Sequence, residues 1–381
     1  MPCDELSYNQ FGETINTRLE GRRVPLSVTV GLTDRCNLRC VHCFVHDPAQ
    51  DQALRSRELN TGQWIRLFDR LTEAGCLWMT MTGGEILLRP DFADLYRYAK
   101  EKGFLLSLLT NGTLLTPELV DLLAEWYPLL VEISLYGLTK ETYEAVTGVP
   151  GAYERCMRGI RMLLEARVPL RLKTIAMVPT RHEVRAMYRF AAELGVEFRH
   201  DGVLFQTFYG KDIGSLRLPP EELVALDLAN PKAVADFQRL HDRYRELLGN
   251  APRDFQEYLY TCGGGFRSFY LDPYGWMGLC QMTRPAVYDL VSGTLEEGWE
   301  VLGEFRQKRV SKDFECLHCA LAGICQRCPA FSFLEHGDPE TRVEYTCAIA
   351  YLRAQQLGLG DFAAEEDFAA IGLGEQGFEK I

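Results

Sequence analysis

The sequence contains no apolar run near the roughly 18 residues that a membrane-spanning helix requires. The stretch from Met1 to Gly21 is polar and shows neither the apolar core nor the cleavage pattern of a signal peptide. Both absences predict a cytoplasmic protein without a membrane partner. Basic tracts are missing too, since 41 Lys and Arg face 53 Asp and Glu and give a net charge of −12. Because phosphate backbones are bound by an excess of Lys and Arg, nucleic acid is not an expected partner.

Cysteine, by contrast, is abundant, with 13 in 381 residues. A chain of this length buries a substantial core without disulfide bonds, and thiols in the cytosol are kept reduced. The cysteines therefore indicate metal ligation or redox chemistry, and their spacing must decide which.

Short apolar runs alternate with longer helical patterns from about Pro25 to Phe208. The expected strands are Leu26–Leu32, Leu77–Met81, Leu105–Thr110, Val131–Leu135, Leu170–Met177 and Gly202–Phe205. A helix is expected over Thr61–Ala74, behind a capping box formed by Asn60 and Gln63. Six strand–helix units predict an α/β fold with a parallel sheet, either a partial, open barrel or a doubly wound sheet. In both folds the loops after the strands carry the chemistry.

The rest of the chain divides by composition. A charged, helical connector is expected over 216–261, with a break at Asn230–Pro231. Residues 262–350 are rich in cysteine and glycine, and begin with a strand–turn–strand pattern over Ser268–Leu271 and Trp276–Cys280. The predicted units are thus an N-terminal segment (1–25), an α/β core (26–215), the connector, a cysteine-rich domain (262–350) and an acidic, loosely ordered tail (351–381).

Cys36, Cys40 and Cys43 follow the first expected strand with the spacing C-x3-C-x2-C. Three thiolates this close on one loop can ligate three irons of a cubane cluster and leave the fourth iron without a protein ligand. A structural zinc site would need a fourth ligand, either His42, His46 or a more distant residue. Chance clustering is the third alternative. An iron without a protein ligand could bind a reactant.

The triad resembles the signature of the radical S-adenosylmethionine (radical SAM) superfamily. The resemblance implies a partial (β/α)6 barrel in which Cys36, Cys40 and Cys43 hold a 4Fe-4S cluster. In that family the free iron chelates S-adenosylmethionine, and one electron from the cluster cleaves the sulfonium to a 5′-deoxyadenosyl radical that abstracts a hydrogen atom from the substrate. His42 stands where the family usually has an aromatic side chain that touches the adenine.

Further residues are similar to the family's S-adenosylmethionine contacts. Gly83-Gly84-Glu85 follows the second expected strand and resembles the segment that receives the methionine ammonium. Two glycines allow the main chain to approach a ligand closely, and a carboxylate is an anionic acceptor. Thr110 and Asn111 resemble a ligand-facing turn. Ser134 and Lys173 resemble positions that hold the ribose and the methionine carboxylate.

Seven cysteines in the C-terminal part resemble the SPASM extension of radical SAM enzymes that modify peptides or form cofactors. The central group reads C-x2-C-x5-C-x2-C, one residue shorter before its fourth cysteine than is usual in the family. The resemblance implies a small SPASM domain with a β-hairpin and two auxiliary clusters, three 4Fe-4S clusters in all. Cys262, Cys280 and Cys328 would hold the first auxiliary cluster, and Cys316, Cys319, Cys325 and Cys347 the second.

Seven thiolates cannot saturate two cubane clusters. The resemblance therefore implies an open iron in the first auxiliary cluster, available to substrate, water or another ligand such as His318. A pair of zinc sites is the alternative. Cys3, Cys76 and Cys156 are left over. Cys76 and Cys156 are expected to be structural rather than hydrogen-atom donors, and the sequence assigns no role to Cys3.

By resemblance, the substrate is a ribosomally synthesised precursor peptide and the product carries a thioether, C–C or C–O crosslink. About 25 residues precede the first strand, so we expect a separate leader-recognition protein, or a direct contact, to deliver the peptide. A flavodoxin or ferredoxin is the expected reductant. The alternatives are an anaerobic sulfatase-maturating (formylglycine-forming) enzyme, a peptide epimerase, a porphyrin- or cofactor-modifying enzyme, and a non-catalytic metal-binding scaffold.

Overall fold

The computed structural model describes residues 8–45, 55–250, 257–283, 287–319, 321–325 and 327–359. Its centre is a parallel sheet in which strands adjacent in the chain are also adjacent in the sheet. The strands are β1 (Ser27–Thr33), β2 (Trp78–Gly83), β3 (Leu105–Thr110), β4 (Leu130–Ser134), β5 (Leu170–Ile175) and β6 (Glu197–Asp201). A doubly wound sheet would reverse its strand order part-way. The partial barrel is therefore confirmed and the doubly wound alternative is excluded.

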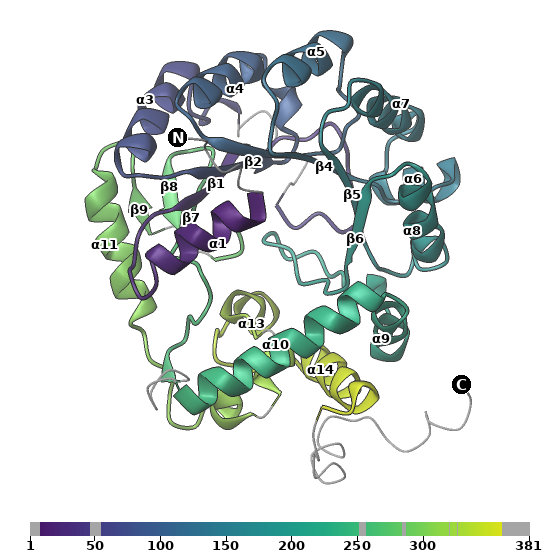
Figure 1. Cartoon of the computed structure of the whole chain (residues 1–381). Coiled ribbons are helices and arrows are strands. Elements are labelled where there is room, and N and C mark those ends of the chain that lie inside the picture. The colour runs from purple at the N-terminus through teal and green to yellow at the C-terminus, as the bar shows by residue number, and fades with distance from the viewer. Residues whose placement is uncertain are drawn as a thin grey trace, which may run out of the picture.

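Helices cover the outer face of this curved sheet (Figure 1). They are α3 (Thr61–Glu73), α4 (Phe92–Glu101), α5 (Pro117–Glu125), α6 (Lys140–Thr147), α7 (Ala152–Glu165) and α8 (Val184–Glu193). Helix α3 shows why they form. Trp64, Phe68 and Leu71 recur at helical spacing and are fully buried against the sheet. The expected capping box is present, because the Asn60 and Gln63 side chains each accept the other's backbone N–H, at 3.0 and 2.9 Å.

The sixth strand lies at Glu197–Asp201 and not at Gly202–Phe205, so that prediction was wrong. Strand β6 pairs only with β5 and forms an edge of the sheet, where its residues are partly exposed. Glu197, Arg199 and Asp201 alternate along it, so it has no apolar run to reveal it in the sequence. Residues 202–205 instead form the loop that follows β6.

The cysteine-rich region continues the same sheet. β7 (Ser268–Leu271) pairs in parallel with β1, from Ser27↔Ser268 to Val30↔Leu271. β8 (Trp276–Gly278) returns antiparallel to β7 and is followed by β9 (Tyr288–Asp289), which confirms the expected hairpin. Asp272 Oδ1 closes the turn by accepting two backbone N–H groups at 2.9 Å. The hairpin is thus held to the barrel by main-chain hydrogen bonds rather than by a linker.

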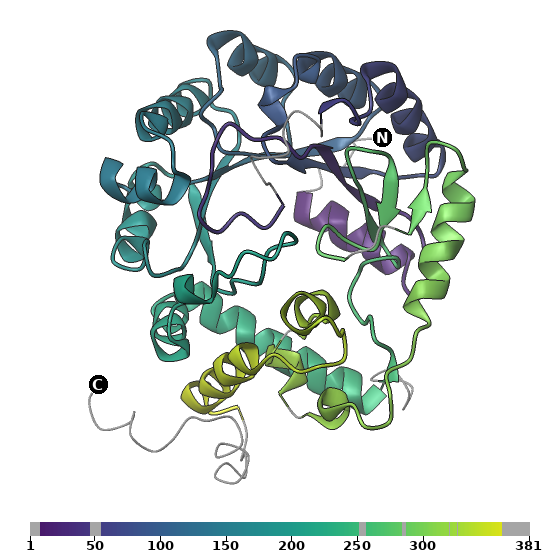
Figure 2. The ribbon, with the colours of Figure 1, turned by 180° about the vertical axis from the view of Figure 1, so that it is seen from behind.

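The remaining elements include α10, α13 and α14, which lie on the open side of the sheet in both views (Figures 1 and 2). The elements are α1 (Tyr8–Arg18), α9 (Pro220–Leu228), α10 (Pro231–Asn250), α11 (Leu295–Arg306), α12 (Ala322–Cys325), α13 (Pro329–His336) and α14 (Glu344–Leu357), with short turns η2 (Ile86–Leu88), η3 (Gly214–Leu216) and η5 (Glu315–His318). The break between α9 and α10 falls at Asn230, as expected, and the Asn230 side chain accepts the Lys232 N–H at 3.0 Å.

Helix α14 runs through the predicted boundary at residue 350, and residues 360–381 of the expected tail lie outside the described residues. Within the described part of the chain, every helix is too short or too polar to cross a lipid bilayer.

Phe269 tests whether the hairpin shares the core of the barrel. It lies on β7, is 1% exposed and packs edge-on against Trp299 of α11. Phe269→Ala should lower the free energy of unfolding by about 3–5 kcal/mol, because it leaves a cavity in the core. The same change at Phe333, which is 40% exposed, should cost less than about 0.5 kcal/mol. Urea unfolding of the metal-free protein measures both, and equal losses would contradict a shared core.

Candidate active site

The N-terminal cysteines lie on the loop that follows β1, at the carboxyl edge of the sheet. The loop is tied to α6, since the Val41 N–H donates to Val146 O at 2.9 Å. At its start, Arg35 donates twice to the buried carboxylate of Glu58, at 3.1 and 2.9 Å. The loop therefore has a defined path, as ligands of a metal cluster require.

Cys36, Cys40 and Cys43 lie close enough for their charges to interact. Burial raises the pKa of Cys36 to about 12, with smaller contributions from the negative charges of Glu85 and Cys43. The pKa of Cys40 is also raised, first by burial and then by its two partner thiols. Because the thiolate is the metal ligand, Cys36 and Cys40 need a bound cation to ionise near neutral pH. The donor set therefore fits a metal cluster at this loop.

Gly83 and Gly84 end β2 directly against the start of the cysteine loop. The Gly84 N–H donates to Thr33 O at 2.7 Å. A Cβ on Gly84 would lie 2.3 Å from Arg35 O, and one on Gly83, where φ is +147°, would lie 2.1 Å from Thr33 O. Only glycine allows this approach. Both glycines line the cavity described below, but they are first required for packing one main chain against another.

Glu85 lies beneath the cavity rather than at its surface. It is fully buried, and its carboxylate accepts hydrogen bonds from Thr110 Oγ1 and the Asn111 N–H, both at 2.7 Å, and from the Leu87 N–H at 3.0 Å. Burial raises its pKa, against the effect of these bonds. The carboxylate accepts three hydrogen bonds here and has about four acceptor positions, so its expected contact with the ligand ammonium stays a prediction. Glu85 positions Thr110 and Asn111, which line the cavity as expected.

Asn111 and His42 bring polar and aromatic groups to the cysteine loop. Asn111 Nδ2 lies 3.9 Å from Cys36 Sγ and donates to Asn37 Oδ1 at 2.9 Å. His42 is 5% exposed and meets the Tyr136 ring edge-on, with centroids 4.7 Å apart. Burial lowers the pKa of His42 to about 4, so its ring is neutral near pH 7. A neutral ring that lines the cavity suits the expected stacking with adenine.

Ser134 on β4 and Lys173 on β5 are register partners, and both line the cavity. Lys173 Nζ lies 3.2 Å from Glu132 Oε1. The roles of Ser134 at the ribose and of Lys173 at the methionine carboxylate stay predictions.

The C-terminal cysteines fall into two sets by the charges that act on one another, and the cluster that each set would hold stays a prediction. Burial raises the pKa of Cys328 to about 11, and the charges of Cys280 and Cys262 add to it. All three also act on the pKa of Tyr260, which lies among them. These three cysteines, distant in sequence, therefore form one group.

The second set is formed by the four other cysteines. Cys325 and Cys347 share a hydrogen bond that lowers the pKa of Cys325 and raises that of Cys347. Burial raises the pKa of Cys316 to about 11, with further contributions from Cys347 and Cys319. Among the residues that the structure describes, no three His, Cys, Asp or Glu side chains surround one point closely enough to hold a single ion.

A cavity of about 1200 Å³ joins the N-terminal triad to the C-terminal cysteines. Cys36, Cys40, Cys43, Cys316, Cys325, Cys328 and Cys347 all line it. Phe44, Phe205 and Phe331 form an aromatic wall between the two ends, with centroids 5.2 and 4.4 Å apart. Phe44 follows Cys43, and the Phe331 N–H donates to Cys328 O at 3.0 Å. A substrate held here would touch the surroundings of both metal sites.

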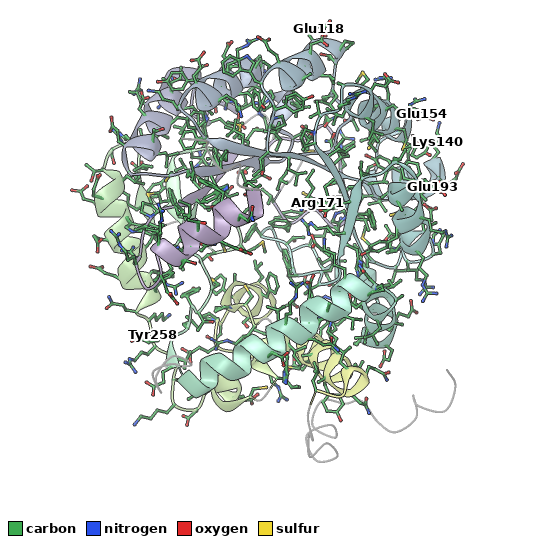
Figure 3. All side chains as sticks on the ribbon, viewed as in Figure 1. Glu118, Lys140, Glu154, Arg171, Glu193 and Tyr258 are labelled. Carbon is green, nitrogen blue, oxygen red and sulfur yellow. The ribbon has the colours of Figure 1, made fainter. Side chains whose placement is uncertain are left out.

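Cations outnumber carboxylates in the cavity lining, eight to four, although the whole chain is acidic. The cations are Arg171, Lys173, Arg199, Lys232, Arg239, Arg327, Arg342 and Arg353, and the carboxylates are Glu197, Asp201, Asp227 and Asp236. Figure 3 shows Arg171 within the curve of the sheet, whereas Glu118, Glu154 and Glu193 project from the outer helices. The acidic character therefore belongs to the exterior, and the cavity is basic.

Glu132 organises the basic side of the cavity, and the sequence analysis missed it. Its side chain is 1% exposed and contacts Arg171, Lys173 and Arg199, at 2.6, 3.2 and 2.8 Å. Burial raises its pKa, but the hydrogen bond from Arg199 and the three positive charges outweigh burial and lower the pKa to about 2. A signal was present, because Glu132 interrupts an apolar run, and basic residues alternate on the next expected strand.

Residues 30–191 match the model of the radical SAM superfamily. These residues therefore form a radical SAM domain. The chain is an enzyme, and a domain of this kind implies S-adenosylmethionine and a 4Fe-4S cluster as its cofactors.

Relatives of this radical SAM enzyme include modifiers of cofactors and of peptides. It is 26% identical over 330 residues to AdoMet-dependent heme synthase of Methanosarcina barkeri, with 82% of this chain and 94% of that protein covered. It is 25% identical over 260 residues to the antilisterial bacteriocin subtilosin biosynthesis protein AlbA of Bacillus subtilis, with 68% and 55% covered. The relatives thus include a heme synthase and a bacteriocin biosynthesis protein.

A solved structure extends the likeness of fold to the C-terminal region. Streptococcus suis SuiB bound to precursor peptide SuiA superposes with a TM-score of 0.64 at 18% identity, covering 91% of this chain and 82% of that chain. The fold likeness therefore runs through the cysteine-rich region, as expected for a SPASM extension.

Gly84 tests the main-chain contact at the cysteine loop. Gly84→Ala should displace the loop, because the added Cβ would lie 2.3 Å from Arg35 O. Iron and sulfide per chain after anaerobic reconstitution should then fall. Gly12→Ala is the matched control, since a Cβ at Gly12 meets nothing within 4 Å. Full metal content in Gly84→Ala would show that this contact does not position the cysteines.

Glu132 should make stability depend on pH. Its folded pKa of about 2 lies below the ordinary 4.5, so it stabilises the fold above pH 4.5 and loses this effect as pH falls toward 2. In the metal-free protein, Glu132→Gln should lower the free energy of unfolding by about 3 kcal/mol at pH 7, and the difference should shrink below pH 4.5. Urea unfolding at several pH values measures it, with exposed Glu193→Gln as the control. Parallel pH curves for the parent and Glu132→Gln would contradict the ion network.

Proposed function

We propose that this enzyme reductively cleaves S-adenosylmethionine at a 4Fe-4S cluster held by Cys36, Cys40 and Cys43, and abstracts a hydrogen atom from a ribosomally synthesised peptide. The peptide then forms a thioether, C–C or C–O crosslink. One observation carries the proposal. A single cavity has the N-terminal triad at one end and C-terminal cysteines at the other, with an aromatic wall between them.

The cluster, when bound, supplies the electron for cleavage of the sulfonium. The residues of this chain bind and orient. Gly83 and Gly84 leave main chain at the cavity surface, Asn111 lies against Cys36, and His42 offers a neutral ring. Phe205 and its aromatic neighbours exclude water from the space where a radical would react.

The C-terminal cysteines are proposed to hold two auxiliary clusters. Cys316, Cys319, Cys325 and Cys347 would hold one, and Cys262, Cys280 and Cys328 the other, with one iron open. Closing a crosslink after hydrogen abstraction removes a second electron and a proton from the peptide. Clusters at the far end of the cavity would supply acceptors for that electron.

Two partners complete the proposal. A small recognition protein, or a direct contact, would present the precursor peptide, and a flavodoxin or ferredoxin would supply electrons. SuiB was solved bound to its precursor peptide SuiA, and its fold is similar over most of this chain.

A second candidate is the modification of a porphyrin side chain. The heme synthase of Methanosarcina barkeri matches over 94% of its length, and a basic cavity suits propionate groups. Epimerisation with a cysteine hydrogen donor has less support among the described cysteines. Cys156 is fully buried in the core, and Cys76 Sγ donates to Pro25 O at 2.8 Å, as expected for structural residues.

Cys36→Ala tests the site of cleavage. Anaerobically reconstituted parent enzyme with dithionite should form 5′-deoxyadenosine from S-adenosylmethionine, and Cys36→Ala should form none, because the cluster loses a ligand. Cys76→Ala, which removes a thiol outside the cavity, should retain the activity. Equal amounts of 5′-deoxyadenosine from the parent and Cys36→Ala would contradict the assignment of the cluster to this loop. Mass spectrometry of a precursor peptide encoded beside the gene should show the loss of two hydrogens, and an unchanged peptide would count against crosslinking.

A further inference from the structure

We propose that the substrate of this enzyme binds through a carboxylate, which Arg171 and Arg199 recognise on the side of the cavity formed by β5 and β6. This inference rests on the proposed function and narrows it to acidic substrates. The inference rests on three basic side chains that surround the buried carboxylate of Glu132 on the cavity wall.

Strand register brings the basic side chains together. Glu132 on β4 pairs with Arg171 on β5, and Lys173 on β5 pairs with Arg199 on β6. Because alternate residues of a strand face the same side, Arg171 and Lys173 both point into the cavity. Their side chains are 30% and 21% exposed, and that of Arg199 is 39% exposed. The three cations are therefore accessible from the cavity, while their shared counter-ion is 1% exposed beneath them.

The contacts with Glu132 orient the basic groups and leave donors unused. Arg171 donates to Glu132 through Nε at 2.6 Å, and its Nη2 also lies 2.6 Å from Glu132, but its Nη1 lies 3.9 Å from Glu197, too far for a hydrogen bond. Lys173 has three donors and a single contact in this cluster, at 3.2 Å. The guanidinium of Arg171 is thus held in place with a free edge, which is the geometry for binding a carboxylate.

The cofactor accounts for only part of this charge. The methionine carboxylate of S-adenosylmethionine needs one cation, and Lys173, next to Ser134 in the register, is the residue expected there. Arg171 and Arg199 are not needed for the methionine carboxylate. Asp201 accepts a hydrogen bond from Arg199 Nη1, and Glu197 lies 3.9 Å from Arg171, so these two exposed carboxylates offset part of the positive charge. The excess of positive charge belongs to the whole cavity lining, where eight cations face four carboxylates.

A purely structural ion network would account for the cluster less well. Of the three carboxylates near these cations, only Glu132 is buried, since Glu197 and Asp201 are 66% and 47% exposed. The exterior shows the opposite bias, since the whole chain carries −12 and eight of the twelve charged residues lining the cavity are basic. The cavity therefore concentrates positive charge where a substrate must bind.

Peptide binding to the reconstituted enzyme with S-adenosylmethionine tests the inference. The probes are a seven-residue peptide with three glutamates and its glutamine counterpart, both blocked at each end, measured by titration calorimetry. The glutamate peptide should bind about tenfold more tightly or better, because each carboxylate gains charge-assisted hydrogen bonds. In Arg171→Gln and Arg199→Gln the ratio of the two binding constants should fall toward one.

Matched variants separate recognition from folding. Arg189→Gln removes the same charge from an exposed position on α8 and should keep the full preference. Arg171→Lys keeps the ion pair with Glu132 but loses the planar fork, and should show an intermediate ratio. Iron content and 5′-deoxyadenosine are measured on every preparation. Absent product in the parent would count against the proposed function, whereas equal binding of both peptides to a parent enzyme that makes the product would overturn the carboxylate inference alone.

A third probe distinguishes the source of the carboxylate. A tetrapropionate porphyrin and its neutral tetramethyl ester are titrated in the same way. Arginine-dependent binding of the porphyrin, without any preference between the peptides, would support carboxylate recognition and assign it to a tetrapyrrole. A preference for the glutamate peptide that Arg171→Gln abolishes assigns it to a peptide.

Discussion

The close approach of two main-chain segments at the edge of the sheet is the constraint on which the active site depends. Gly83 and Gly84 allow the end of β2 to contact the start of the cysteine loop without a side chain between them. This contact sets where the loop leaves β1 and therefore where the three thiols lie. Glu85, next in the chain, then holds the end of β3 from below. One short segment thus links the first three strands at the point where the cofactors are expected.

A second set of contacts places the C-terminal cysteines relative to the first. β7 adds to the main sheet beside β1, so the hairpin is fixed to the barrel by main-chain hydrogen bonds. Helix α14, which carries Cys347, is held by a buried network in which Asp227 accepts from Arg353 at 2.7 Å and lies 3.0 Å from His200 of β6. Both edges of the parallel sheet therefore anchor the cysteine-rich region. Such anchoring maintains a fixed distance between the two groups of cysteines at opposite ends of one cavity.

The distribution of charge separates the interior from the exterior. Basic residues of β5 and β6 face inward around Glu132, while Glu118, Glu154 and Glu193 project from the outer helices. A parallel sheet with helices on one side permits this separation, because alternate residues of each strand face opposite environments. The open inner face can then be polar and charged without disturbing the apolar contacts between the sheet and the helices.

Local patterns in the sequence were enough to predict most of the core strands, one helix start and the superfamily. The apolar runs located five of the six core strands, the capping box at Asn60 located the start of α3, and the cysteine spacing indicated the superfamily. These features depend on residues close together in the chain. Strand β6 was misplaced because its edge position makes it charged. Only the folded chain shows which atoms the Glu85 carboxylate contacts. Only the tertiary structure brings the distant cysteines together around one cavity and places three cations around Glu132. Strand register and sheet curvature bring these residues together, and no short spacing in the sequence relates them.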